Sequence, residues 1–212
     1  MDLKELFNKL NLYETLGYFL VGSMFLTLMY FNNVLLKNIQ FNLHDFKNEV
    51  LIPVLLLSYF FGHLIQAISN IIFDIISKFI PYLKEQNTFS EAEVSLLEEV
   101  RIHFNLASNI KDKTIWGNLM TYAKKNDYIG EVNRFNSYYS LYRGWAIVFF
   151  INSFLLSAQF MYLRWNWYSY KQFWFFLILN LIISIIFIKR SKRFWNYTKY
   201  KVFQSYKLNK IQ

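Results

Sequence analysis

The sequence contains no cysteine, and this absence removes several classes of protein at once. Disulfide scaffolds, thiolate zinc sites, iron–sulfur clusters and cysteine nucleophiles all require a thiol. Histidine is also scarce: the only three are at positions 44, 63 and 103, and no pair has the helical spacing of metal ligands. We therefore expect no bound metal and no cofactor.

Catalytic motifs are missing as well. The chain has no HExxH, GxSxG, GxGxxG or Walker pattern, and no paired carboxylates in its apolar segments. Glu98, Glu99, Arg101 and His103 are the nearest approach to a catalytic cluster, but alternating charges are ordinary on the surface of a helix. The sequence therefore predicts that the protein is not an enzyme.

Apolar residues are abundant, at 55% of the 212 residues, and they are gathered into long runs. A helix needs about 20 apolar residues to cross a bilayer core of about 30 Å. We therefore expect an all-α polytopic membrane protein with four transmembrane helices. Their expected ranges are about 17–36, 51–73, 144–163 and 173–188, and the last two form a hairpin.

The remaining segments are more polar. Residues 1–16 have an amphipathic pattern that predicts an interfacial helix, and the apolar run after 73 continues as a stalk to about residue 83. Residues 84–143 are expected to be a small cytoplasmic helical region. Its helices are predicted at 90–106 and 114–126 and from Gly130 onward, and the first begins at a capping box of Ser90 and Glu93.

The distribution of basic residues predicts the orientation. Of the 23 lysines and arginines, 19 lie in the amino terminus, residues 78–143 and the tail, and four lie in the two short loops. The positive-inside rule then places both termini and the middle region in the cytoplasm. Acidic residues at the amino terminus argue against a cleaved signal peptide, so we expect the first span to stay as an anchor.

A row of polar residues on the second span is the most informative feature. His63, Gln66, Asn70 and Asp74 are spaced by three, four and four, which places them on one helical face. Polar groups in hydrocarbon are costly unless they face a partner or water. The row either hydrogen-bonds to neighbouring helices, lines a water-filled path in an oligomer, or binds a ligand or lipid. The expected partners for such bonds are Asn152, Ser153, Ser157, Gln159, Asn180 and Ser184.

Basic residues flank the last two spans. Arg134 and Arg143 are available either to snorkel to the membrane boundary or to hold a regulatory phosphate. The tail, residues 189–212, interleaves basic and aromatic side chains, which favours anionic lipid headgroups over nucleic acid directly after a span. The residues expected at the headgroups are Lys189, Arg190, Lys192 and Arg193.

The layout, together with the stretches 59–66 (YFFGHLIQ) and 141–144 (LYRG), resembles small four-span membrane proteins of prokaryotic antiviral loci. These include accessory proteins beside CRISPR type VI-B nucleases and effectors of nucleotide-signalling defence. The resemblance implies an oligomeric component that changes the permeability of the envelope or modulates a nuclease. It also implies a location in a bacterial inner (cytoplasmic) membrane.

Two functions are therefore expected. The first is a homo-oligomer that forms a pore or perturbs the membrane; the alternative is a non-conducting anchor or regulatory subunit that docks a soluble partner.

Overall fold

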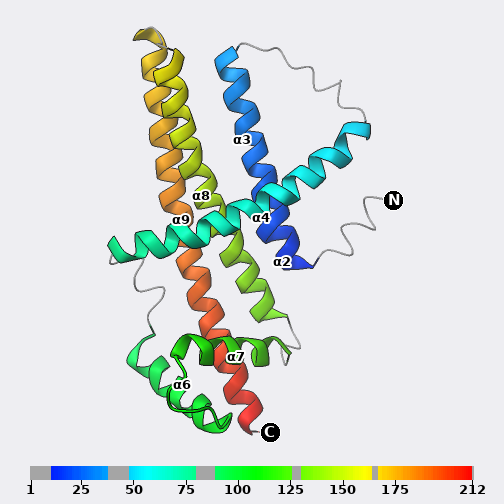
Figure 1. Cartoon of the computed structure of the whole chain (residues 1–212), viewed down its shortest axis with the longest axis vertical. Helices are drawn as coiled ribbons and strands as arrows, with labels where there is room; N and C mark the ends of the chain where they lie inside the picture. The colour runs from blue at the N-terminus through cyan, green and yellow to red at the C-terminus, as the bar shows by residue number, and fades with distance from the viewer. Residues whose placement is uncertain (1–10, 38–47, 80–88, 126–129, 164–166, 212) are drawn as a thin grey trace. The chain divides into compact units, whose positions relative to one another are not determined.

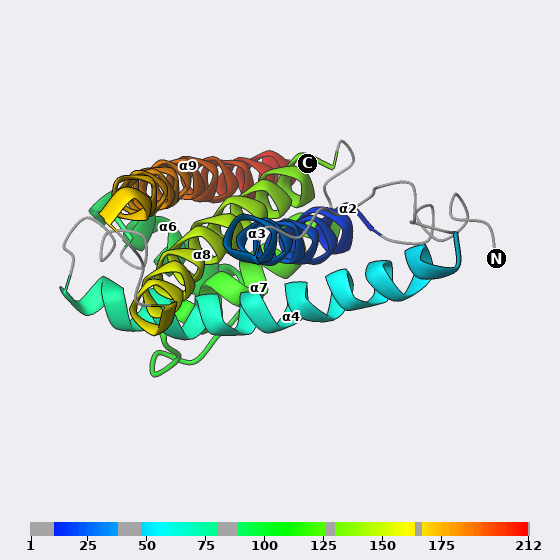
Figure 2. The same ribbon diagram turned by 90° about the horizontal axis from the view of Figure 1, so that it is seen from above.

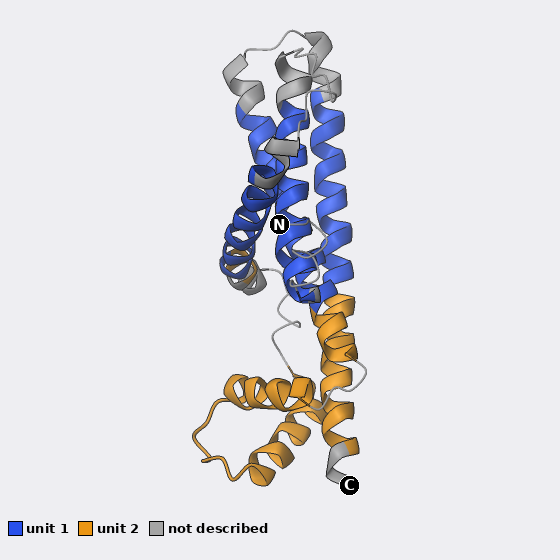
Figure 3. Cartoon of the chain, turned by 90° about the vertical axis from the view of Figure 1, so that its right-hand side faces the viewer, with its two compact units in different colours: residues 1–71, 137–191 blue, residues 72–136, 192–212 orange. Residues whose placement is uncertain are grey.

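The structure, a computed structural model, describes residues 11–37, 48–79, 89–125, 130–163 and 167–211, and over these residues it is all-helical (Figure 1). Four helices are long and apolar enough to cross a membrane, which confirms the expected fold class. The chain divides into two compact units, coloured in Figure 3. Unit 1 comprises residues 1–71 and 137–191, and unit 2 comprises residues 72–136 and 192–212.

Three helices of unit 1 form a bundle. α3 (Leu20–Lys37) follows the short helix α2 (Leu12–Glu14) and the π-helical turn η1 (Thr15–Phe19). It runs in the same direction as α8 (Glu131–Leu163), and α9 (Trp167–Ile211) returns antiparallel to α8. The register is fixed by contacts along their length: Asn32 bonds to Asn152, Asn152 bonds to Asn180, and Tyr142 packs on Phe187.

The fourth long helix, α4 (Asn48–Phe79), crosses α3 and α8 instead of running along them (Figures 1 and 2). At the crossing the two backbones touch. A Cβ on Gly22 would lie 1.7 Å from the carbonyl oxygen of Ser58, and a Cβ on Gly62 would lie 1.9 Å from that of Tyr18. Small residues therefore allow α3 and α4 to meet without side chains between them.

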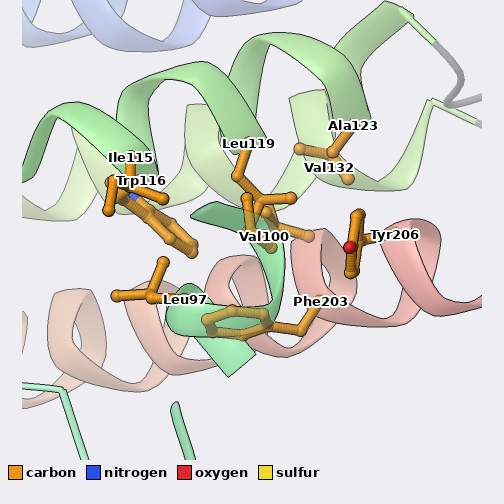
Figure 4. Close-up of a cluster of buried hydrophobic side chains, with 10 residues drawn as sticks. Leu97, Val100, Ile115, Trp116, Leu119, Ala123, Val132, Phe203 and Tyr206 are labelled. Carbon is orange, nitrogen blue, oxygen red and sulfur yellow. The ribbon is translucent and has the colours of Figure 1, made fainter. Parts of the chain in front are cut away.

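Unit 2 is built around the carboxy-terminal part of α9. α6 (Glu91–His103), α7 (Asp112–Lys125) and the start of α8 surround it. Figure 4 shows how side chains from all four helices meet in its core. The core residues are Leu97, Val100, Ile115, Trp116, Leu119, Ala123, Val132, Val202, Phe203 and Tyr206. Burial of this aromatic and aliphatic surface stabilises the unit without any disulfide.

The observed helix bounds refine the sequence predictions. The capping box is present: Ser90 accepts from the backbone N–H of Glu93, and the Glu93 carboxylate accepts from that of Ser90. α6 ends at His103, three residues earlier than expected, and α7 begins two residues earlier. The interfacial helix expected at 1–16 falls largely outside the described residues.

The basic tail is helical over the part that the structure describes. It is a direct continuation of α9, and its residues from 192 onward belong to unit 2 together with the segment expected to be a separate cytoplasmic region. Lys199 pairs with Glu93 at 3.0 Å, and Lys201 pairs with Glu131 at 2.7 Å. These two lysines are therefore paired within unit 2, and Val202, Phe203 and Tyr206 of the same segment belong to its core. Contact of the tail with lipid stays a prediction.

We predict that replacing Gly62 by leucine disrupts the crossing of α3 and α4, because the new side chain overlaps the Tyr18 carbonyl. Overpacking of this kind costs about 1–3 kcal/mol, which lowers Tm by roughly 3–10 °C for a chain of this size. Thermal unfolding in detergent measures the change. Gly117→Leu is the matched control, because no atom lies within 4 Å of a Cβ there. Equal Tm values for the two variants would contradict the close crossing.

Candidate functional site, a polar cluster at Arg143

Gln66 lies where α4 crosses α3 and α8, and its side chain is 5% exposed. Its amide Nε2 donates to two backbone carbonyl oxygens, those of Gly17 and Ser140, both at 2.8 Å. Its Oε1 lies 3.4 Å from the hydroxyl of Ser69, which also donates to the Gln66 backbone carbonyl. One side chain on α4 is thus bonded to η1 and α8 together.

Arg143 brings a positive charge to the same place. Its Nη2 donates to Oδ1 of Asn70, and lies 3.4 Å from Oε1 of Gln66. Its Nη1 donates to the hydroxyl of Tyr139 at 3.0 Å, and the guanidinium lies 5.0 Å from the centre of that ring. We call Gln66, Asn70, Tyr139, Ser140 and Arg143 the boundary cluster.

Two glycines make room for the boundary cluster. A Cβ on Gly144 would lie 2.8 Å from Nε2 of Gln66, and one on Gly17 would lie 2.8 Å from the Ser140 hydroxyl. Within the described residues that hydroxyl is buried without a hydrogen-bond partner. The glycine of the stretch 141–144 therefore has a structural role, because a side chain at this position would collide with the Gln66 amide.

The position of Arg143 along α8 indicates its depth. Twenty residues separate it from the end of α8 at Leu163, which at 1.5 Å per residue is about 30 Å, the thickness of the hydrocarbon core. A span that begins at Gly144, as the sequence predicts, would place Arg143 at its boundary, whereas the apolar stretch of this helix as a whole runs from Glu131 to Ala158. Its side chain contacts α4 rather than only extending along its own helix, so it does more than snorkel.

The other predicted members of the polar row are in different surroundings. His63 is exposed, with its ring stacked 3.7 Å from Tyr18 and edge-on to Tyr59 at 4.6 Å. Asn70 is also exposed, although its Oδ1 accepts a hydrogen bond from Arg143. Asp74 lies on α4, but its side chain is outside the described residues. Of the four, the structure brings Gln66 and Asn70 together with Arg143.

A second polar layer lies deeper in unit 1, and Asn32 was not among the predicted residues. Asn32 donates to Asn152 at 2.6 Å, Asn152 to Asn180 at 2.9 Å, and Asn180 to the carbonyl of Phe176 at 2.7 Å. Asn152 is nine residues from Arg143, about 14 Å along α8, which is near the middle of the span that the sequence predicts at 144–163. An asparagine inside an apolar span is itself the signal that could have identified Asn32.

The partners expected for the polar row are mostly used elsewhere. Asn152 and Asn180 bond within the second layer, and Ser184 donates to the carbonyl of Ala146 at 2.8 Å. Ser153 and Ser157 donate to carbonyls of their own helix, and the side chain of Gln159 is outside the described residues. Polar side chains therefore do form hydrogen bonds between helices, but Gln66 bonds to the Ser140 carbonyl of α8 and not to the expected partners.

The basic residues assigned to lipid headgroups have these positions. Lys189 and Arg190 are exposed, and the Arg190 guanidinium lies 5.0 Å from the centre of the Tyr142 ring in unit 1. In unit 2, Lys192 is half-buried and Arg193 Nε donates to the hydroxyl of Tyr197 at 3.1 Å. Their contact with lipid stays a prediction. Among the described residues, no three His, Asp or Glu side chains are grouped as metal ligands.

We predict that Gln66→Leu destabilises unit 1, because it removes two hydrogen bonds between helices while keeping the side-chain size similar. Interhelical bonds of this kind contribute about 0.6–1.7 kcal/mol each in membranes. Unfolding titrations with SDS in mixed micelles measure the loss. Ala67→Leu is the control, since Ala67 is adjacent and exposed. A stability for Gln66→Leu equal to that of wild type would show that the amide does not join these helices.

Comparisons with known proteins gave no match. No family model matches the sequence, and no curated protein or solved structure is significantly similar to it. Function is therefore inferred from the chemistry and position of the described residues.

Proposed function

We propose that this chain is an integral membrane protein that assembles with copies of itself and changes the permeability of the membrane. The observation that carries the proposal is the exposure of polar groups on apolar helices. Asn70 and His63 are both exposed on α4, and Arg143 is half-exposed beside Asn70. Such groups are stable on a span only where they meet water or another polar surface.

The exposed side of α4 supports assembly. On one side of α4, Ser58, Gly62 and Asn70 contact the neighbouring segments. On another side of the same helix, Leu56 and Phe60 are 63% and 61% exposed. The outer part of this helix is therefore free to pack on another copy. One copy has too few helices to enclose a wide path, so several copies would have to place their α4 helices around it.

Antiviral defence is the proposed setting, as an effector or as an accessory beside a nuclease. It rests on the resemblance in layout to four-span proteins of antiviral loci, and it stays a prediction. In that setting, unit 2 would bind the molecule or partner that activates the protein. Binding there would be coupled to unit 1 because α8 and α9 are continuous helices that contribute residues to both units.

Flux through liposomes tests the proposal. We expect the purified wild-type protein, reconstituted at matched density, to release potassium ions or a small dye. Asn70→Leu and His63→Leu should reduce the rate about tenfold, because an apolar surface at a narrow path raises the barrier to water and ions by about 1.4 kcal/mol. Phe154→Leu is the control, since Phe154 is 63% exposed on α8 and both residues are apolar.

Flux that is equal in all four proteins would contradict a path lined by α4. No flux from a fully inserted wild-type oligomer, with unit 2 intact, would contradict the pore itself and favour the alternative function.

The alternative is a non-conducting anchor that docks a soluble partner, and an exposed face of α6 favours it. Ile102 is 72% exposed and Val94 is 44% exposed, eight residues apart on the same side of the helix. In this alternative, these two side chains form part of the surface that the partner covers.

Ile102→Asp separates the two functions. A pore should keep its flux in this variant, whereas an anchor should lose its partner, measured by co-purification with the candidate nuclease. Val94→Asp should behave in the same way if the surface is shared. Loss of flux with an intact fold would instead connect this face to the pore.

A further inference from the structure

A groove on unit 2 lies between α6 and the last turns of α9. It encloses about 450 Å³, which is within the range of small-molecule sites. On α9 its lining residues recur every three or four positions between Asn196 and Leu208, so they share one face of the helix. This face is about 18 Å long at 1.5 Å per residue.

The interior of the groove is mainly apolar. Phe203, which is 6% exposed, belongs to the core of unit 2, and Leu96 packs against that core from α6. Two further lining residues, Tyr200 and Leu208, are 62% and 59% exposed. A hollow with apolar walls and exposed apolar residues next to it favours an occupant that carries a long apolar part.

The charges of the groove are unequal. Lys199 is 7% exposed, and its ammonium group pairs with both carboxylate oxygens of Glu93 at 3.0 and 3.2 Å. That pair is neutral as a unit. Lys207 is exposed at the edge of the groove and leaves its lining with a net positive charge, which favours an anionic group there.

We propose that this groove binds a single-chain anionic amphiphile, such as a fatty acid or a lysophospholipid. The acyl chain lies along Leu96, Phe203 and Leu208, and the carboxylate or phosphate pairs with Lys207. The site is separate from the boundary cluster, and it does not depend on whether the protein conducts ions. It gives unit 2 a ligand of its own.

Photolabelling of the full chain in neutral phosphatidylcholine nanodiscs tests the site. The probes are palmitic acid and lysophosphatidic acid, each with a diazirine in its chain, and labelled peptides are identified by mass spectrometry. Labelling of peptides from α6 and from residues 196–208 is expected, with the peptides of the spans as the internal reference for lipid contact. Labelling by palmitic acid alone would indicate a site for a carboxylate head group, labelling by lysophosphatidic acid alone a site for a phosphate, and labelling by both a site that accepts either.

Two variants and a control test whether labelling depends on the charge of Lys207 and on the open volume of the groove. Lys207→Glu should reduce labelling of the groove about tenfold, the value of one hydrogen bond to a charged group. Gln204→Trp should reduce it by filling the groove. Lys113→Glu makes the same charge change on α7, outside the groove, and should leave labelling unchanged. Circular dichroism establishes that each variant is folded.

Three results would overturn the proposal. The first is labelling confined to the spans. The second is equal labelling by an uncharged diazirine fatty alcohol, which would show that the anionic head is not recognised. The third is unchanged labelling in folded Lys207→Glu and Gln204→Trp, which would show that the probe lies outside the groove.

Discussion

The amide of Gln66 is the interaction on which the arrangement of unit 1 depends. It donates to two backbone carbonyls from different parts of the chain, those of Gly17 and Ser140, in a place where 5% of its own surface is exposed. An unsatisfied amide there would be costly, so α4 can occupy only positions that keep both bonds. The glycines at 17, 22, 62 and 144 admit this geometry, and Arg143 and Asn70 complete its polar surroundings.

Unit 2 follows a different physical principle. Its helices are short and amphipathic, and the aromatic side chains of α9 supply much of the core. The basic residues that alternate with them turn outward or pair with acids, as Lys199 does with Glu93 and Lys201 with Glu131. The same helix is thus mainly apolar between residues 173 and 188, with Asn180 and Ser184 as polar exceptions, and amphipathic in unit 2. Its composition changes near Lys189 without any break in the helix.

The sequence was sufficient for the features that depend on local pattern. Long apolar runs predicted the four long helices, and Ser90 with Glu93 predicted the start of α6. It was not sufficient for features that depend on tertiary contact. The partner of Gln66 proved to be backbone, which no residue pattern reveals, and the crossing of α4 depends on glycines whose close contacts lie on another helix. The basic charges of the tail are visible in the sequence, whereas the fit of Val202 and Tyr206 into the core of unit 2 is not.

Self-assembly is the central claim, because a single copy exposes the polar residues of α4 and cannot enclose a path. The most direct test is native mass spectrometry of the full chain released from nanodiscs, which counts subunits without relying on flux. We predict a discrete oligomer whose subunit number is unchanged by Phe154→Leu. A monomer at every protein concentration would contradict the account.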